Sequence, residues 1–236
     1  MKKFFTFLLL IVIPVLAYEV FNPEDYNYTK SGDKLLFVID FSNSMSEYIE
    51  NQTKANQVKE VMAHILPKIS ADTKVGLRVY GHTCNLVAFN ACRSSELITP
   101  LGYNNSAEIA SELHKLRPRG MTPITYSLKQ AVKKDFNGQG VNKGVNKGVK
   151  HIILLTDGGE NCDESPCDYA ISLMKQRRDI KIDVIAFDVH DGDDLAQLRC
   201  TADVTGGSFV EADTKAELFN SMNGLVVPHK NVEAVI

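Results

Sequence analysis

The chain has 236 residues, a formal net charge of −3 and 44% hydrophobic residues, with five cysteines and no tryptophan. A mildly acidic chain without a basic stripe argues against a protein that binds nucleic acid through its phosphates. The length and apolar content suffice for one α/β domain with a full core after a short leader.

Residues 1–17 have the pattern of a secretory signal peptide. Two lysines open the segment, residues 4–16 are almost wholly apolar, and Ala17 is a small residue at a plausible cleavage point. A membrane anchor is the alternative, but the run is shorter than the ~20 residues of a spanning helix and contains Pro14. We therefore expect an exported protein, periplasmic or secreted, with no stable membrane span after cleavage. Residues 18–33 form an N-terminal extension with a sequon at Asn27, whose glycosylation stays open.

Strand and helix patterns alternate from residue 34 to residue 227, which we predict as one domain followed by a tail over residues 228–236. The predicted strands are Lys34–Asp40, Lys74–Tyr80, Glu96–Leu101, the run that ends at Asp157, Ile182–Val189 and Ser208–Glu211. Apolar side chains at helical spacing lie between them, as in Val58, Val61, Met62 and Ile65. This alternation predicts a doubly wound α/β fold: a mostly parallel six-stranded sheet in the order 3-2-1-4-5-6, with one antiparallel edge strand and helices on both faces.

Helix starts are marked by capping sequences. Asn105 with Glu108 and Thr214 with Glu217 predict capping boxes. Thr122 and Ser165 each precede a proline, which predicts a capped helix with proline at its first position. The Gly-Val-Asn-Lys repeats within residues 138–150 indicate a flexible basic loop.

Oxygen-bearing side chains gather at the ends of the first and fourth predicted strands. Asp40, Ser42 and Ser44 form an Asp-x-Ser-x-Ser sequence after the first strand, and Asp157 ends the fourth. Thr122 lies at a loop-to-helix junction between them. Carboxyl ends of neighbouring parallel strands meet at one edge, so these groups should converge there. Each also has a local alternative, because serine and threonine cap helices and aspartate favours turns.

This set, in this order, resembles the metal-ion-dependent adhesion site of von Willebrand factor type A domains. The resemblance implies that Ser42, Ser44 and Thr122 bind a metal through their hydroxyls, while Asp40 and Asp157 act through water or by holding the serines. Mg²⁺ or Mn²⁺ suits such hard oxygen ligands. A shell of neutral hydroxyls leaves the cation short of negative charge. We therefore expect a protein partner that offers an Asp or Glu carboxylate.

The predicted function is a metal-dependent, adhesion-type binding module rather than an enzyme. A metal-dependent hydrolase that uses a cation-activated water is the alternative. The sequence lacks Gly-x-Ser-x-Gly and His-Glu-x-x-His patterns, and no residue pair recommends itself as nucleophile and base. An accessory subunit of an ATP-driven machine is disfavoured by the predicted export and by the absence of a phosphate-binding loop.

The cysteines of an exported chain predict disulfides. Local pairing would join Cys84 to Cys92 and Cys162 to Cys167, and Cys200 would remain as a buried apolar residue or an intermolecular bridge.

Two groups of acidic residues lie near the predicted site. One is expected at the metal face; the other forms either a second cation cluster or an acidic front to a helix. They are Glu160, Asp163 and Glu164 in the first group, and Asp188, Asp191, Asp193 and Asp194 with His190 in the second.

Overall fold

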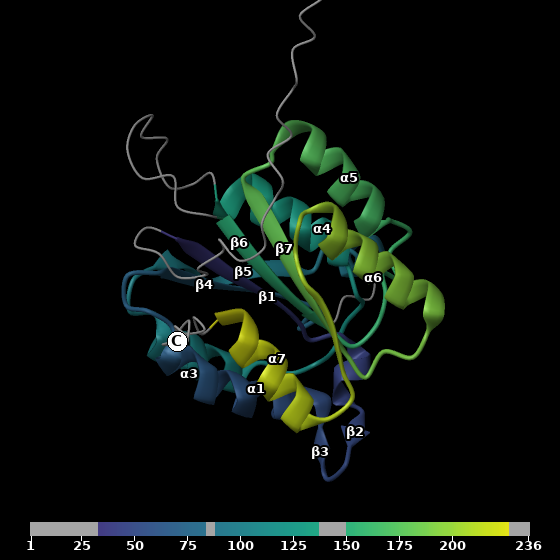
Figure 1. The fold of residues 1–236 in the computed structure, drawn as a ribbon. Helices are drawn as coiled ribbons and strands as arrows, with labels where there is room; N and C mark the ends of the chain where they lie inside the picture. The colour runs from purple at the N-terminus through teal and green to yellow at the C-terminus, as the bar shows by residue number, and fades with distance from the viewer. Residues whose placement is uncertain (1–32, 84–87, 137–149, 227–236) are drawn as a thin grey trace, which may run out of the picture.

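The computed structural model describes residues 33–83, 88–136 and 150–226. Its centre is a six-stranded sheet in the order β5-β4-β1-β6-β7-β8 (Figure 1). The strands are β1 (Lys34–Asp40), β4 (Lys74–Tyr80), β5 (Ser95–Gly102), β6 (Lys150–Thr156), β7 (Ile180–Phe187) and β8 (Phe209–Ala212). Only β5, at one edge, is antiparallel among the strands of this sheet. The predicted fold class and strand order are confirmed. The predicted signal peptide, the sequon and the 138–149 repeat lie outside the described residues.

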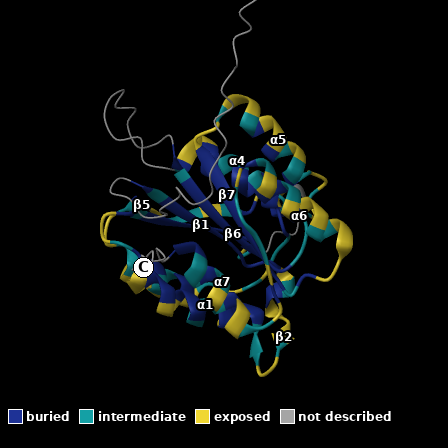
Figure 2. Cartoon of the chain, viewed as in Figure 1, coloured by how far each residue is buried: buried dark blue, intermediate teal, exposed yellow. Residues whose placement is uncertain are grey.

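Helices cover both faces of the sheet (Figure 1). One layer consists of α1 (Lys54–Ile65), α3 (Ser106–Lys115) and α7 (Lys215–Val226). The other consists of α4 (Ile124–Gln130), α5 (Pro166–Gln176) and α6 (Gly192–Val204). Phe37 of β1 packs in the first core and Leu36 in the second, because successive strand residues face opposite sides. The sheet is therefore buried on both faces, as Figure 2 shows.

Short elements complete the described part of the chain. Among them is a small antiparallel hairpin, β2 (Tyr48–Ile49) with β3 (Gln52–Thr53), which projects beyond α1 and which the sequence did not predict. The others are the 3-10 turns η2 (Asn43–Ser46) and η3 (Leu66–Lys68), the helix α2 (Ala88–Ala91) and the π-helical turn η4 (Ala131–Asp135). Among the described residues, no helix is both long and apolar enough to cross a membrane.

The predicted helix caps are confirmed in part. The Thr214–Glu217 capping box forms, and Ser165 caps α5 by accepting from Asp168 N–H. Asn105 does not cap α3, because its amide instead donates to backbone carbonyls of the neighbouring strands. Thr122 does not cap α4 either: the helix begins at Ile124 and makes no side-chain cap.

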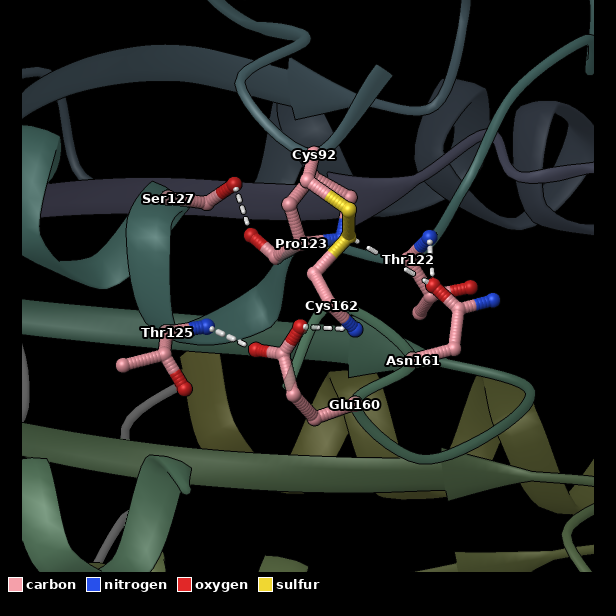
Figure 3. Close-up of a disulfide and its surroundings, with 8 residues drawn as sticks. All are labelled: Cys92, Thr122, Pro123, Thr125, Ser127, Glu160, Asn161 and Cys162. Carbon is pink, nitrogen blue, oxygen red and sulfur yellow. Dashed lines mark hydrogen bonds between the residues drawn. A yellow bond between two sulfur atoms is a disulfide. The ribbon is translucent and has the colours of Figure 1, made fainter. Parts of the chain in front are cut away.

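The predicted disulfide pairing is wrong. The structure joins Cys92 to Cys162 (Figure 3) and Cys167 to Cys200, each with a Cα–Cα distance of 5.4 Å. Cys200 is therefore neither free nor an intermolecular link, and Cys84 lies outside the described residues. The reason is tertiary: α5 and α6 lie side by side on one face of the sheet, which brings together cysteines 33 residues apart. Spacing along the chain carries no such information.

Candidate metal centre

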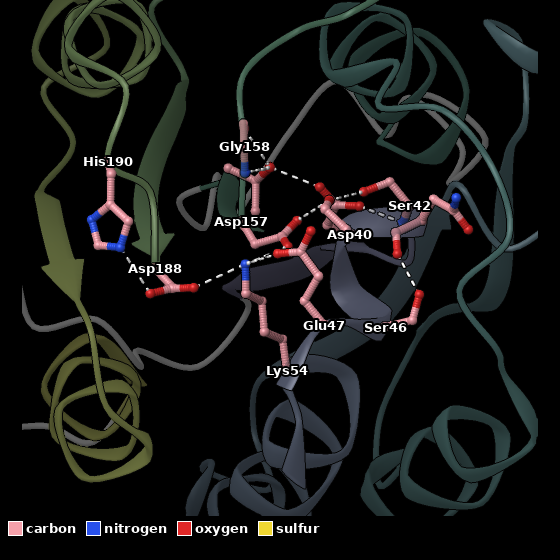
Figure 4. A network of polar contacts seen from close by, with 12 residues as sticks. Asp40, Ser42, Ser46, Glu47, Lys54, Asp157, Gly158, Asp188 and His190 are labelled. Carbon is pink, nitrogen blue, oxygen red and sulfur yellow. Dashed lines mark hydrogen bonds and ion pairs between the residues drawn. The ribbon is translucent and has the colours of Figure 1, made fainter. Parts of the chain in front are cut away.

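The candidate site lies where the strand order reverses, between β1 and β6. Ile39 pairs with Leu155 in the parallel ladder, so the strands deliver Asp40 and Thr156 side by side at their carboxyl ends. Ligands of open α/β sheets bind at this kind of edge. Figure 4 shows the polar network that follows.

Asp40 organises the first loop from a fully buried position. Its Oδ1 accepts a 2.6 Å hydrogen bond from Ser42 N–H, and its Oδ2 accepts a 2.8 Å bond from the Thr156 hydroxyl. Burial, and then the neighbouring charge of Asp157, raise the pKa of Asp40 to about 7. Both its oxygens therefore accept hydrogen bonds from within the protein.

The two serines and Asp157 form a chain of oxygen atoms. The Ser42 and Ser44 hydroxyls are 3.1 Å apart, and the Ser44 hydroxyl donates to Asp157 Oδ1 over 2.8 Å. Ser42 precedes the turn η2 in an extended conformation and makes no side-chain cap. The capping alternative therefore does not hold for Ser42.

Thr122 reaches the same edge on a separate loop. Asn43 N–H donates to Gly120 O over 2.9 Å, so the two loops run side by side. Gly81, at the end of β4, lies between them with φ +72°, and a Cβ there would come within 2.5 Å of Ser42 N and 2.8 Å of Met121 O. Only glycine permits both the left-handed backbone and this close approach.

Lys54 is a site residue that the sequence reasoning missed. Its Nζ lies 3.2 Å from Asp157 Oδ2, 2.9 Å from Asp188 Oδ2 and 3.1 Å from Glu47 Oε2. Burial opposes its charge, but these carboxylates outweigh burial and raise the pKa of the Lys54 ammonium. A signal was present, because Lys54 continues the buried stripe of α1 one turn before Val58.

Asp157 is held between a hydroxyl and this ammonium. Burial raises the pKa of its carboxyl, and Lys54 opposes that shift. Its Oδ2 is buried and contacts Lys54 only as an ion pair, without the alignment of a hydrogen bond. The site thus contains an incompletely satisfied oxygen and a pair of nearby carboxylates. A divalent cation would give the buried oxygen a positive partner and would reduce the repulsion between the two carboxylates. The donor set therefore fits Mg²⁺ or Mn²⁺.

The other acids have local roles. Glu160 accepts from the amides of Thr125 and Cys162, and Glu164 pairs with Lys129 at 2.6 Å. Asp191 caps α6, as expected of an acidic helix front. Elsewhere in the described chain, Asp188, His190 and Asp213 bring ligand atoms within 4.8 Å of one another, with Asp188 already bound to Lys54.

A model of the von Willebrand factor type A domain matches residues 34–223. The chain therefore belongs to this family, as the resemblance predicted. Its relatives include two uncharacterized proteins of Bacillus subtilis (strain 168). YwmC is 29% identical over 227 residues, covering 92% of this chain and 94% of the relative; YwmD is 26% identical over 214 residues, covering 87% and 90%.

Solved structures share the fold. Proximal thread matrix protein 1 from the mussel byssus, described with a zinc-occupied MIDAS motif, has a TM-score of 0.60 at 22% identity, over 83% of this chain and 45% of that one. BatB from Bacteroides thetaiotaomicron has a TM-score of 0.62 at 15% identity, over 83% and 97%. This chain spans less than half of the mussel protein. Both likenesses concern the fold alone.

Proposed function

We propose that this chain is an exported, metal-dependent protein-binding module. In it, Ser42, Ser44 and Thr122 hold Mg²⁺ or Mn²⁺ through their hydroxyls, and a carboxylate of a protein partner completes the coordination. The observation that carries the proposal is the continuous network from Asp40 through Ser42 and Ser44 to Asp157.

The charges of the site favour an acidic ligand. The proposed metal ligands are neutral hydroxyls, and Asp40 directs both oxygens to protein donors. Asp157 shares its charge with Lys54. A bound dication would therefore keep part of its charge and attract a carboxylate at an open position, as Mg²⁺ commonly keeps exchangeable water ligands.

Export is supported by the two disulfides, since such bonds persist mainly in oxidising compartments. Fractionating the producing cells and testing each fraction for the protein distinguishes a periplasmic location from secretion into the medium.

The hydrolase alternative gains no support from Lys54. Its ammonium is bound by carboxylates, and its raised pKa makes it a poor base. That alternative predicts turnover of a substrate, whereas the binding module predicts a stable, metal-dependent complex.

The test is capture of partner proteins on the immobilised chain with Mg²⁺ and with EDTA, followed by the same capture on Thr122→Ala. We expect a partner that is released by EDTA and weakened by the substitution. Because Thr122 does not cap α4, this variant should unfold at nearly the wild-type denaturant concentration. Binding that persists unchanged in EDTA would contradict the proposed mechanism.

A further inference from the structure

The loop that follows Asp157 is hydrogen-bonded to the loop that carries Thr122 (Figure 3). Thr122 N–H donates to Asn161 Oδ1 over 2.7 Å, and Asn161 N–H donates back to Thr122 O over 3.4 Å. These reciprocal bonds fix the backbone on both sides of the Thr122 Cα. The distance of Thr122 from Asp157 is therefore set by a segment only a few residues long.

Glu160, in the loop that follows Asp157, connects this loop to helix α4 through further hydrogen bonds. Its Oε2 accepts from Thr125 N–H over 2.7 Å, and its Oε1 accepts from Cys162 N–H over 3.0 Å. The first turn of a helix has amide groups without intrahelical partners, and α4 makes no side-chain cap of its own. Glu160 thus supplies from another segment the cap that Thr122 does not provide.

One disulfide anchors the loop that follows Asp157. Cys162 follows Asn161 directly and is joined to Cys92, which lies 70 residues earlier and shortly before strand β5. The other disulfide, Cys167–Cys200, joins helices α5 and α6 instead. Of these two disulfides, Cys92–Cys162 anchors the loop next to Thr122, and Cys167–Cys200 serves as a matched control.

We propose that Asn161 and Glu160, anchored by the Cys92–Cys162 disulfide, are positioning residues that set the metal-binding geometry of Thr122. The metal part rests on the proposed function, whereas the geometric part concerns the protein alone. Groups that orient metal ligands commonly change metal affinity by about ten- to a hundredfold when they are removed.

The first experiment compares the two disulfides in a Cys84→Ser parent, so that no other thiol can pair. We expect Cys92→Ser/Cys162→Ser to bind Mn²⁺ about tenfold more weakly by calorimetry. The control Cys167→Ser/Cys200→Ser should keep the parent affinity. Equal losses in both variants, or no loss in either, would overturn the proposal.

The second experiment separates positioning from general stability. Asn161→Leu removes the acceptor for Thr122 N–H, whereas Asn161→Asp keeps an oxygen at that place. We expect weaker Mn²⁺ binding and faster hydrogen exchange at Thr122 N–H in the leucine variant only. Equal behaviour of the two variants would contradict the assigned role.

Amide exchange also separates this inference from the proposed function. If the parent chain binds no Mn²⁺, the proposed function fails. Hydrogen exchange at Thr122 and Thr125 in the metal-free disulfide variants then decides the inference. If the Cys92–Cys162 disulfide holds Asn161 and Glu160 in place, its removal should selectively reduce the protection of these two amides.

Discussion

At the scale of single residues, the site is defined by how its charges are balanced. Asp40 is fully buried beside a second carboxylate, and Asp157 is buried against a lysine. Neither acid lies in the ordinary solvent environment of a surface aspartate. Both should therefore report on cation binding through their protonation.

The first prediction concerns pH and the stability of the metal-free chain. The raised pKa of Asp40, about 7, means that the folded state keeps a proton that the unfolded state loses near pH 4. The contribution of this group to stability is therefore full below about pH 4 and is lost as pH rises through about 7. Urea unfolding of wild type and Asp40→Asn should show the variant gaining stability relative to wild type over this range. A constant difference between them would contradict the assignment.

The second prediction concerns Lys54. Its positive charge lies against Asp157, so it should weaken the binding of a dication. Lys54→Met should tighten Mg²⁺ binding by roughly tenfold or more. The reason is that the repulsion between a cation and a unit positive charge a few Å away exceeds about 1 kcal/mol at an effective dielectric constant of about 20. The same variant should be less stable without metal, because its carboxylate partners lose their counter-ion.

Calorimetry checks the change in affinity. The control is Lys115→Met, which removes an equal charge from an exposed pair with Glu112 on α3. Unchanged or weaker Mg²⁺ binding in Lys54→Met would show that the lysine does not oppose the cation.

At the scale of elements, a buried ion pair fastens η4 to the sheet. Arg78 of β4 binds Asp135 through two hydrogen bonds of 2.6 and 2.8 Å, and both residues are buried. Asp135→Ala would leave the guanidinium buried without its partner, which typically costs about 3–5 kcal/mol of unfolding free energy. Glu112→Ala, at the exposed pair with Lys115, should cost no more than about 1 kcal/mol. Urea unfolding compares the two, and equal small losses would refute the structural role of the pair.

The strands were predictable from the sequence because the parallel sheet is buried on both faces. Such strands are continuous apolar runs, and Leu35 to Ile39 is one. Helix caps were predictable only where the capping side chain had no stronger partner. Asn105 failed because carbonyls of neighbouring strands compete for its amide, and nothing local to the sequence records that competition.

At the scale of the whole molecule, the site is an assembly of loops from distant parts of the chain. The sequence predicted that Asp40, Ser42, Ser44 and Asp157 would meet at one sheet edge, because they follow the ends of neighbouring parallel strands. It did not predict Lys54, whose role depends on the approach of Asp188, just after β7, to α1. It predicted disulfides but not their pairing, which depends on the packing of α5 against α6 and on the meeting of loops at the sheet edge.

The central claim is that the hydroxyls of Ser42 and Ser44 hold a divalent cation, and one Mg²⁺ titration tests it most directly. Ser46 provides a matched control, because it lies in the same turn but its hydroxyl donates to Asn43 O instead of joining the site. We predict that the parent and Ser46→Ala each bind one Mg²⁺ and that Ser44→Ala loses this binding. Equal binding by Ser44→Ala and Ser46→Ala would contradict the metal centre.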